Sequence, residues 1–209
     1  MKKIVYVFAL FSSLLSINCK FSNPTASPYS KIEIFPLNLN NSWNYTCLHY
    51  SLNSDNSIKG LIDSSEIIME VVKTDSMDSF KGYYVKNLIV NTFPALKMLL
   101  KNENDGLYIA SVDELLTTSP RHAKVERVLK YPTADNDSST FAGYTIKTKS
   151  SSEKITINNR TYACVLYDVY QSSGIVAQFW MIPNIGIVKT WQYFGYTMYE
   201  FKLNSYTLN

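Results

Sequence analysis

The sequence predicts a mainly β protein built on an antiparallel sheet, arranged as a sandwich or a barrel. Runs of Val, Ile, Thr and Tyr alternate with polar residues along most of the chain, and Asn, Asp, Ser or Gly bound each run. These turn-forming residues recur roughly every eight to twelve residues, which favours hairpins over parallel strands joined by helices. Sequence with helical periodicity is scarce, and the length of 209 residues suits one domain.

The alternating runs give the expected strands, roughly ten in number. In chain order the runs lie at residues 31–34, 43–47, 67–72, 83–90, 97–100, 107–110, 144–149, 154–157, 162–170, 175–182, 187–194 and 197–203. Trp43 and Tyr45 share one face of a strand, so we expect them to serve the core. Phe35-Pro36 and Tyr131-Pro132 each precede an aromatic residue that opens a strand. Two related halves of a sheet would produce this weak echo, and so would chance.

Helix is expected in one short place only. Residues 111–116 can form a helix capped by Ser111, because Glu114 follows three residues later as in a capping box. Residues 125–129 fit either a helix or a strand. Residues 135–140 are expected to form a polar loop.

The N-terminus has the layout of an export signal. Lys2 and Lys3 precede an apolar run from Ile4 to Leu15, which is too short to span a bilayer comfortably. The following segment up to Cys19 (LSINC) resembles a bacterial lipobox, whose cysteine receives a diacylglycerol and becomes the first residue of the mature chain. A plain secreted protein cleaved near Cys19 and an uncleaved anchor are the alternatives.

This resemblance implies three parts of the chain. Residues 1–18 would be a lipoprotein signal peptide, and residues 19–30 would be lipidated Cys19 with a flexible tether rich in Ser, Pro and Asn. Residues 31–209 would form a single β-rich domain. We therefore expect a lipid-anchored protein of the bacterial cell envelope, at the outer membrane and facing either the periplasm or the cell surface.

The composition excludes several classes of protein. An aromatic content of 14%, with 16 tyrosines, and a net charge of only +3 do not fit a disordered chain. Removal of residues 1–18 takes away two lysines and no acid, which leaves 18 basic and 17 acidic residues. No clustered basic excess remains, so we expect no nucleic-acid partner.

Four segments resemble a group of uncharacterised bacterial lipoproteins. Residues 35–45 (FPLNLNNSWNY) are similar to the group's FPL-x-x-G-x-x-W-x-Y opening, and residues 183–189 (PNIGIVK) are similar to its P-G-x-G-x-V-K motif. Residues 155–165 and 199–203 resemble its strand-turn-strand segment and its closing strand. The resemblance implies a single, strongly curved antiparallel sheet, half-barrel or barrel-like, with at most one or two short helices. It would be akin to periplasmic lipoprotein carriers of the LolA type, with an apolar concave face.

Residues suited to catalysis or metal binding are few and scattered. His49 and His122 lie on different segments without an acidic or cysteine partner at ligand spacing, and no phosphate-binding or nucleophile motif is present. We expect neither an enzyme nor a cofactor. After lipidation of Cys19, the pair Cys47 and Cys164 remains; an exported protein could join them in a disulfide or bury both as free thiols.

The densest aromatic run lies near the C-terminus. It includes Trp180, Trp191 and Tyr193, which we place on the concave face of the sheet as contacts for a hydrophobic ligand; packing in the core is the alternative. The leading hypothesis is a membrane-anchored envelope lipoprotein with a non-catalytic binding or structural role, holding a lipid or other hydrophobic ligand. The second hypothesis is a surface interaction or adhesion protein that binds a macromolecular partner.

Overall fold

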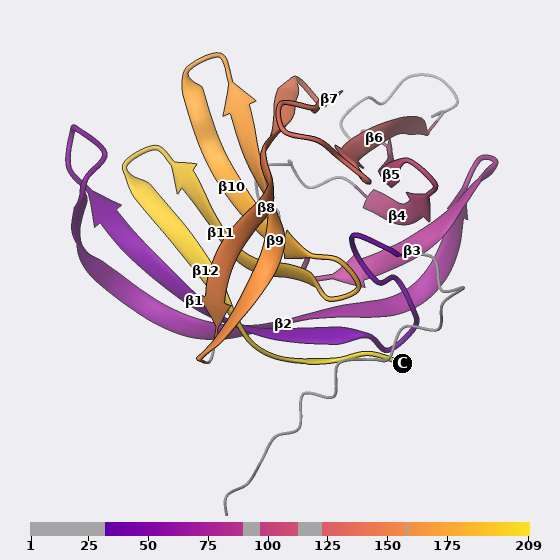
Figure 1. Ribbon diagram of the computed structural model, residues 1–209, viewed down its shortest axis with the longest axis horizontal. Helices are drawn as coiled ribbons and strands as arrows, with labels where there is room; N and C mark the ends of the chain where they lie inside the picture. Colours follow the sequence, from indigo (N-terminus) through magenta and orange to yellow (C-terminus); the bar gives the residue numbers. More distant parts are fainter. Residues whose placement is uncertain (1–31, 90–96, 113–122, 158) are drawn as a thin grey trace, which may run out of the picture. The chain divides into compact units, whose positions relative to one another are not determined.

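Twelve strands make up most of the computed structural model, which describes residues 32–89, 97–112, 123–157 and 159–209 (Figure 1). All neighbouring strands pair antiparallel in one sheet, which curves until it is nearly closed and barrel-shaped. The described residues contain no helix. The strands are β1 (Ser42–Leu52), β2 (Ile58–Met77), β3 (Phe80–Lys86), β4 (Lys97–Glu103), β5 (Gly106–Val112), β6 (Lys124–Lys130), β7 (Ser138–Phe141), β8 (Tyr144–Ile157), β9 (Arg160–Gln171), β10 (Gly174–Ile182), β11 (Gly186–Phe194) and β12 (Thr197–Thr207).

The strand order confirms the predicted fold class, an antiparallel and strongly curved single sheet. Each strand pairs with its neighbours in the chain, except that β1 also pairs with β12, while β6 and β7 form the two edges. The sheet therefore consists of two meanders of six strands joined through β1 and β12. Phe35-Pro36 precedes the first meander and Tyr131-Pro132 precedes the second.

Side chains hold the two edge strands together where the sheet does not close by backbone pairing. The hydroxyl of Ser139 on β7 donates to the carbonyl oxygen of Val128 on β6, at 2.6 Å. The Tyr167 hydroxyl donates to the Lys130 carbonyl oxygen at 2.9 Å, and the Lys130 ammonium lies 2.8 Å from a carboxylate oxygen of Asp137. These contacts link the two edges of the sheet, where β6 and β7 face each other without a backbone ladder.

The segment before β1 closes one end of the sheet. Ile34, Phe35 and Leu37 are buried, and the Phe35 ring stacks on the Trp43 ring with centroids 4.9 Å apart. We expected a strand at residues 31–34, and that prediction is wrong over residues 32–34, which form no strand: Ile34 is buried in the core, whereas Ile32 is exposed. Residue 31 lies outside the described residues.

Other predicted boundaries also change. The predicted loop at residues 135–140 contains the start of β7, and residues 125–129 belong to β6. Residues 111 and 112 end β5, so the expected helix does not begin there; the rest of it lies outside the described residues. The first part of β2, residues 58–66, was missed because its polar residues at 63–66 break the apolar alternation.

Alternation along the strands defines an interior face and an outer face of the sheet. Trp43 and Tyr45 are fully buried on β1, as predicted for structural residues. The indole nitrogen of Trp43 donates to the carbonyl oxygen of Ile185 at 2.6 Å, and the Tyr45 hydroxyl donates to that of Ile187 at 2.7 Å. The two sequence motifs at residues 35–45 and 183–189 are thus parts of one structural contact.

Candidate functional site

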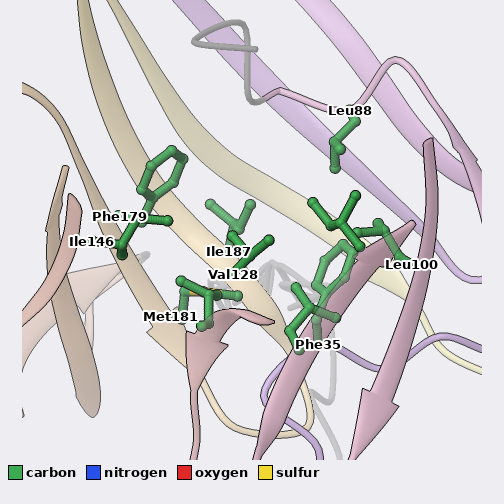
Figure 2. A pocket seen from close by; sticks show the side chains of 11 residues that line it. Phe35, Leu88, Leu100, Val128, Ile146, Phe179, Met181 and Ile187 are labelled. Carbon is green, nitrogen blue, oxygen red and sulfur yellow. The ribbon is translucent and has the colours of Figure 1, made fainter. Parts of the chain in front are cut away.

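The interior of the sheet is nearly filled by side chains. It encloses a cavity of about 40 Å³, lined by eleven apolar side chains from both meanders and the segment before β1 (Figure 2). Those labelled in Figure 2 are Phe35, Leu88, Leu100, Val128, Ile146, Phe179, Met181 and Ile187. Pockets that bury a small molecule usually measure about 300–1,000 Å³, so this cavity is too small for an acyl chain.

The three aromatic residues expected on the concave face lie on the outer face. Phe179 and Met181 of β10 line the interior cavity, so Trp180 between them points outward. Lys189 lies opposite Trp180 on β11, and its ammonium stands 4.9 Å from the centre of the Trp180 ring, on the same face. Trp191 and Tyr193 alternate with Lys189 and share that face. The prediction that these three residues lie on the concave face is therefore wrong.

These residues form a continuous patch, which we call the outer aromatic surface: Trp180, Lys189, Trp191, Tyr193 and Glu200. The three aromatic side chains are half-buried, and the rings of Trp191 and Tyr193 lie 4.7 Å apart at 56°. Cross-strand pairing places Glu200 of β12 directly beside Trp191 of β11. Aromatic rings and a carboxylate are thus presented together.

Glu200 is held by basic residues on both sides. Its carboxylate lies 3.1 Å from the Lys189 ammonium and 3.0 Å from the Lys202 ammonium, while the Tyr50 hydroxyl lies 3.5 Å away. Burial by itself raises the pKa of Glu200, but hydrogen bonds from Lys202 and Lys189 and their charges outweigh it and lower the pKa below its usual value. The carboxylate is therefore ionised at neutral pH and fixes both lysines beside the rings.

A buried polar pair supports the neighbouring strands on the same outer face. The Gln178 amide donates to a carboxylate oxygen of Asp168 at 2.6 Å, and the Tyr170 hydroxyl donates to the other oxygen at 3.2 Å. Asp168 is only 3% exposed and Gln178 8% exposed. Because buried polar groups are costly unless paired, this contact fixes the register of β9 and β10 under the outer aromatic surface.

The two cysteines are free thiols in the structure. Cys47 lies on β1 and Cys164 on β9, and both are buried. Of the two alternatives that the sequence left open, the structure has the two buried thiols. Burial raises the pKa of both thiols, that of Cys164 to about 11, so neither is activated as a nucleophile.

His49 lies beside one aromatic and one acidic residue. Its ring stacks on Tyr199 with centroids 4.2 Å apart, and its Nδ1 atom lies 3.5 Å from a carboxylate oxygen of Asp63. In the described ranges, no group of three His, Cys, Asp or Glu residues is placed to hold a metal ion. Cys19 and His122 lie outside the described residues.

The aromatic members of the outer aromatic surface were predicted from the sequence, whereas Lys189, Glu200 and the Asp168–Gln178 pair were not. Alternation within β11 would have placed Lys189 beside Trp191. The sequence carries no signal for the register between β11 and β12, which brings Glu200 to the same place.

No family model, no curated protein and no solved structure matches this chain. The resemblance to bacterial lipoproteins therefore stays a prediction. Within the part of the chain that the structure describes, there is no helix long and apolar enough to cross a membrane.

Proposed function

We propose that this chain is a non-catalytic binding domain of the cell envelope that uses its outer aromatic surface to bind a protein partner. The observation that carries the proposal is the direction of Trp180, Trp191 and Tyr193, which point outward over a filled interior. Tryptophan and tyrosine supply a large share of the binding energy at protein interfaces, mostly from the centre of a patch.

The charged residues of the surface would give the interaction its specificity. Glu200 between Lys189 and Lys202 leaves a surplus of positive charge beside the rings, so the proposed partner presents a carboxylate there. A partner that buried the three aromatic side chains would also exclude water from these ion pairs and strengthen them.

The interior supports this proposal over a lipid carrier. The central cavity of about 40 Å³ has room for a few small groups only, and the larger hollow of about 320 Å³ beside β2 is open to solvent, with Glu66 and Asn87 in its lining, whereas lipid-binding proteins enclose several hundred cubic ångströms. The outer aromatic surface needs no such volume. The second hypothesis from the sequence, an interaction protein, is therefore the one we carry forward.

The membrane anchor is a separate part of the proposal. Lipidation of Cys19 would hold the domain at a membrane, and residues 20–30 would let it reach a partner. Labelling of expressing cells with an alkyne fatty acid tests this step. The wild type should be labelled and Cys19→Ser should not. An unlabelled wild type would refute the anchor but would not bear on the proposed binding surface.

Binding through the surface is tested with purified variants and solubilised envelope proteins. Trp191→Ala should weaken retention of a discrete partner by at least about tenfold, since aromatic residues at interface centres contribute about 2 kcal/mol or more. Tyr196→Ala is the matched control, because Tyr196 is 77% exposed on the turn between β11 and β12 but lies outside the surface. Equal loss in both variants would sink the proposal.

A further inference from the structure

One stretch of strand β2 has a hydrogen-bonding partner on one side only. Strand β1 pairs with β2 from Ile58 to Glu70, whereas β3 pairs with it from Glu70 to Met77. Among the described residues, no strand pairs with the other side of residues 58–69. We call residues 58–64 the free edge of β2; they are the part nearest the β1–β2 hairpin turn, at the left margin of the sheet in Figure 1.

The backbone groups of the free edge that point away from β1 can be identified. The Asn87 side-chain amide donates to the carbonyl oxygen of Ile68 at 2.9 Å, from the side opposite β1. Ile68 lies opposite Asn44 of β1, and Leu61 lies opposite Tyr50. Because successive residues of β1 direct their backbone groups to opposite sides, Asn44 and Tyr50 share one orientation. Their partners therefore share one too, and the N–H and C=O groups of Leu61 point to the unpaired side.

The side chains of the free edge leave it suited to pair with another strand. Ile58, Leu61 and Ile62 are each more than half exposed. Proteins commonly protect an open strand edge with charged side chains, proline or a covering segment. The free edge has no proline, and Lys59 and Asp63 are its only charged residues.

The edge of β8 offers a contrast. Beyond its pairing with β7, the Asn136 amide donates to the carbonyl oxygen of Thr148 at 2.7 Å, and the Thr148 amide donates to that of Asp137 at 2.8 Å. The Ser151 amide then donates to the carboxylate of Asp135 at 2.7 Å. The chain thus covers the first open part of β8 with its own polar groups, and the described residues provide no such cover for the free edge of β2.

The two charged residues make the free edge complementary to itself. Lys59 and Asp63 lie at equal distances in sequence on either side of Leu61. In an antiparallel pair of two copies, a two-fold axis at Leu61 places Lys59 of each copy opposite Asp63 of the other. Opposite charges at facing positions stabilise a strand pair. Both residues are available, because Lys59 forms no ion pair with a described residue and the Asp63 side chain is 66% exposed beside His49.

The shape of the edge agrees with this register. The ladder between β1 and β2 shifts on both sides of Leu61. At such shifts side chains depart from strict alternation, which lets the long side chain of Lys59 reach the facing carboxylate. The turn of the second copy, residues 53–57, would lie beside residues 65–69 and end before β3, which pairs only from Glu70 onward.

We propose that the free edge of β2 pairs antiparallel with the free edge of a second copy, about a two-fold axis at Leu61, and joins two sheets into one. A foreign peptide would need an acid and a base at the same spacing, and β2 itself supplies both. Two-fold symmetry is also the commonest arrangement of identical chains. The pairing uses β2, whereas the outer aromatic surface lies on β10, β11 and β12, so this inference does not rest on the proposed function.

Disulfide crosslinking of the full chain in expressing cells tests the pairing. Leu61 would face its own copy with Cα atoms about 5.5 Å apart, which is within the range of a disulfide. Leu61→Cys should therefore give a dimer under mild oxidation, seen on a non-reducing gel and lost on reduction. Ile68→Cys is the matched control, because Ile68 is 56% exposed and Leu61 57% exposed, but Ile68 lies outside the free edge.

The outcomes of this experiment separate the possible occupants of the edge. Both variants keep Cys47 and Cys164, so a difference between them comes from the new thiol. Equal crosslinking at both positions would mean random collision, and no dimer from position 61 would mean that the edge stays unpaired; either result would refute the proposal. A crosslinked band of a mass other than twice that of the chain would assign the edge to a different protein.

Reversing the charges tests the register. In the Leu61→Cys background, Lys59→Asp should lower the dimer yield at least about threefold, because two facing ion pairs become two repulsive pairs. Adding Asp63→Lys should restore the yield. Lys154→Asp, which makes the same charge change on β8, should leave the yield unchanged, and circular dichroism of the purified variants checks that each one folds. A double variant that stays as low as Lys59→Asp, or an equal loss with Lys154→Asp, would overturn the proposal.

Discussion

Replacing Gly186 with alanine tests the contact between the two sequence motifs. Gly186 begins β11 with φ of +99°, a region that residues with side chains rarely adopt. An added Cβ would stand 2.6 Å from Cδ2 and 2.8 Å from Cε2 of Phe35, which is itself buried against Trp43. The substitution therefore combines backbone strain with overpacking in the core.

The two costs can be separated by a matched control. A left-handed backbone costs a residue with a side chain about 1–2 kcal/mol, and overpacking of a core adds about 1–3 kcal/mol. We expect Gly186→Ala to lower the free energy of unfolding by about 2–5 kcal/mol. Gly195 has φ of +60°, but an added Cβ there meets no atom within 4 Å. Gly195→Ala should therefore show only the backbone cost.

Urea denaturation followed by tryptophan fluorescence measures both variants. Combining Gly186→Ala with Phe35→Leu removes ring atoms from the clash, so the double variant should be more stable than the sum of the single effects predicts, by about 0.5–3 kcal/mol. If Gly186→Ala destabilises no more than Gly195→Ala, or if the double variant shows no coupling, the close approach of Phe35 and Gly186 is refuted.

Three further predictions follow from the site and the core. Because burial raises the pKa of Cys47 and that of Cys164 to about 11, both thiols should react slowly with a disulfide reagent at pH 8 in the native protein and rapidly in denaturant; a denatured, unreduced chain with neither thiol reactive would indicate a disulfide. The lowered pKa of Glu200 contributes stability that is present above its unfolded-state pKa of about 4.3 and is lost as the pH falls through the lower folded-state value. Glu200→Gln should therefore reduce the fall in melting temperature between about pH 5 and pH 3. An unchanged dependence of the melting temperature on pH would contradict this. Val128→Ile adds one methylene to the cavity and should raise the stability by up to about 0.8 kcal/mol in thermal melts, whereas a loss would mean that the cavity is already filled.

The fold class could be predicted from the sequence because one face of most strands is apolar and the other is polar. The alternation in residues 187–194 predicted β11 to within one residue, and that in residues 197–203 predicted the start of β12, which continues for four more residues to Thr207. The alternation of Ile32 and Ile34 wrongly predicted a strand, because Ile34 is buried by a segment that does not pair with the sheet and Ile32 is exposed. Periodicity records burial, and it does not tell which structure provides the burial.

The site could be predicted only in part. The sequence identified Trp180, Trp191 and Tyr193 as an unusual group, but alternation along one strand defines two faces without telling which face is the interior. That assignment depends on Phe179 and Met181, whose inward position follows from contacts with distant strands. The position of Glu200 depends on the register of β12, which is likewise set by contacts far apart in the chain.

Site-specific photo-crosslinking tests most directly whether the protein binds through its outer aromatic surface. A benzophenone amino acid is placed at position 191 within the surface or at position 196 on the neighbouring turn, and each variant is irradiated with solubilised envelope proteins. If the surface binds a partner, position 191 should give one discrete crosslinked protein and position 196 little or none, although Tyr196 is 77% exposed. Equal crosslinking at both positions, or crosslinking only at position 196, would contradict it.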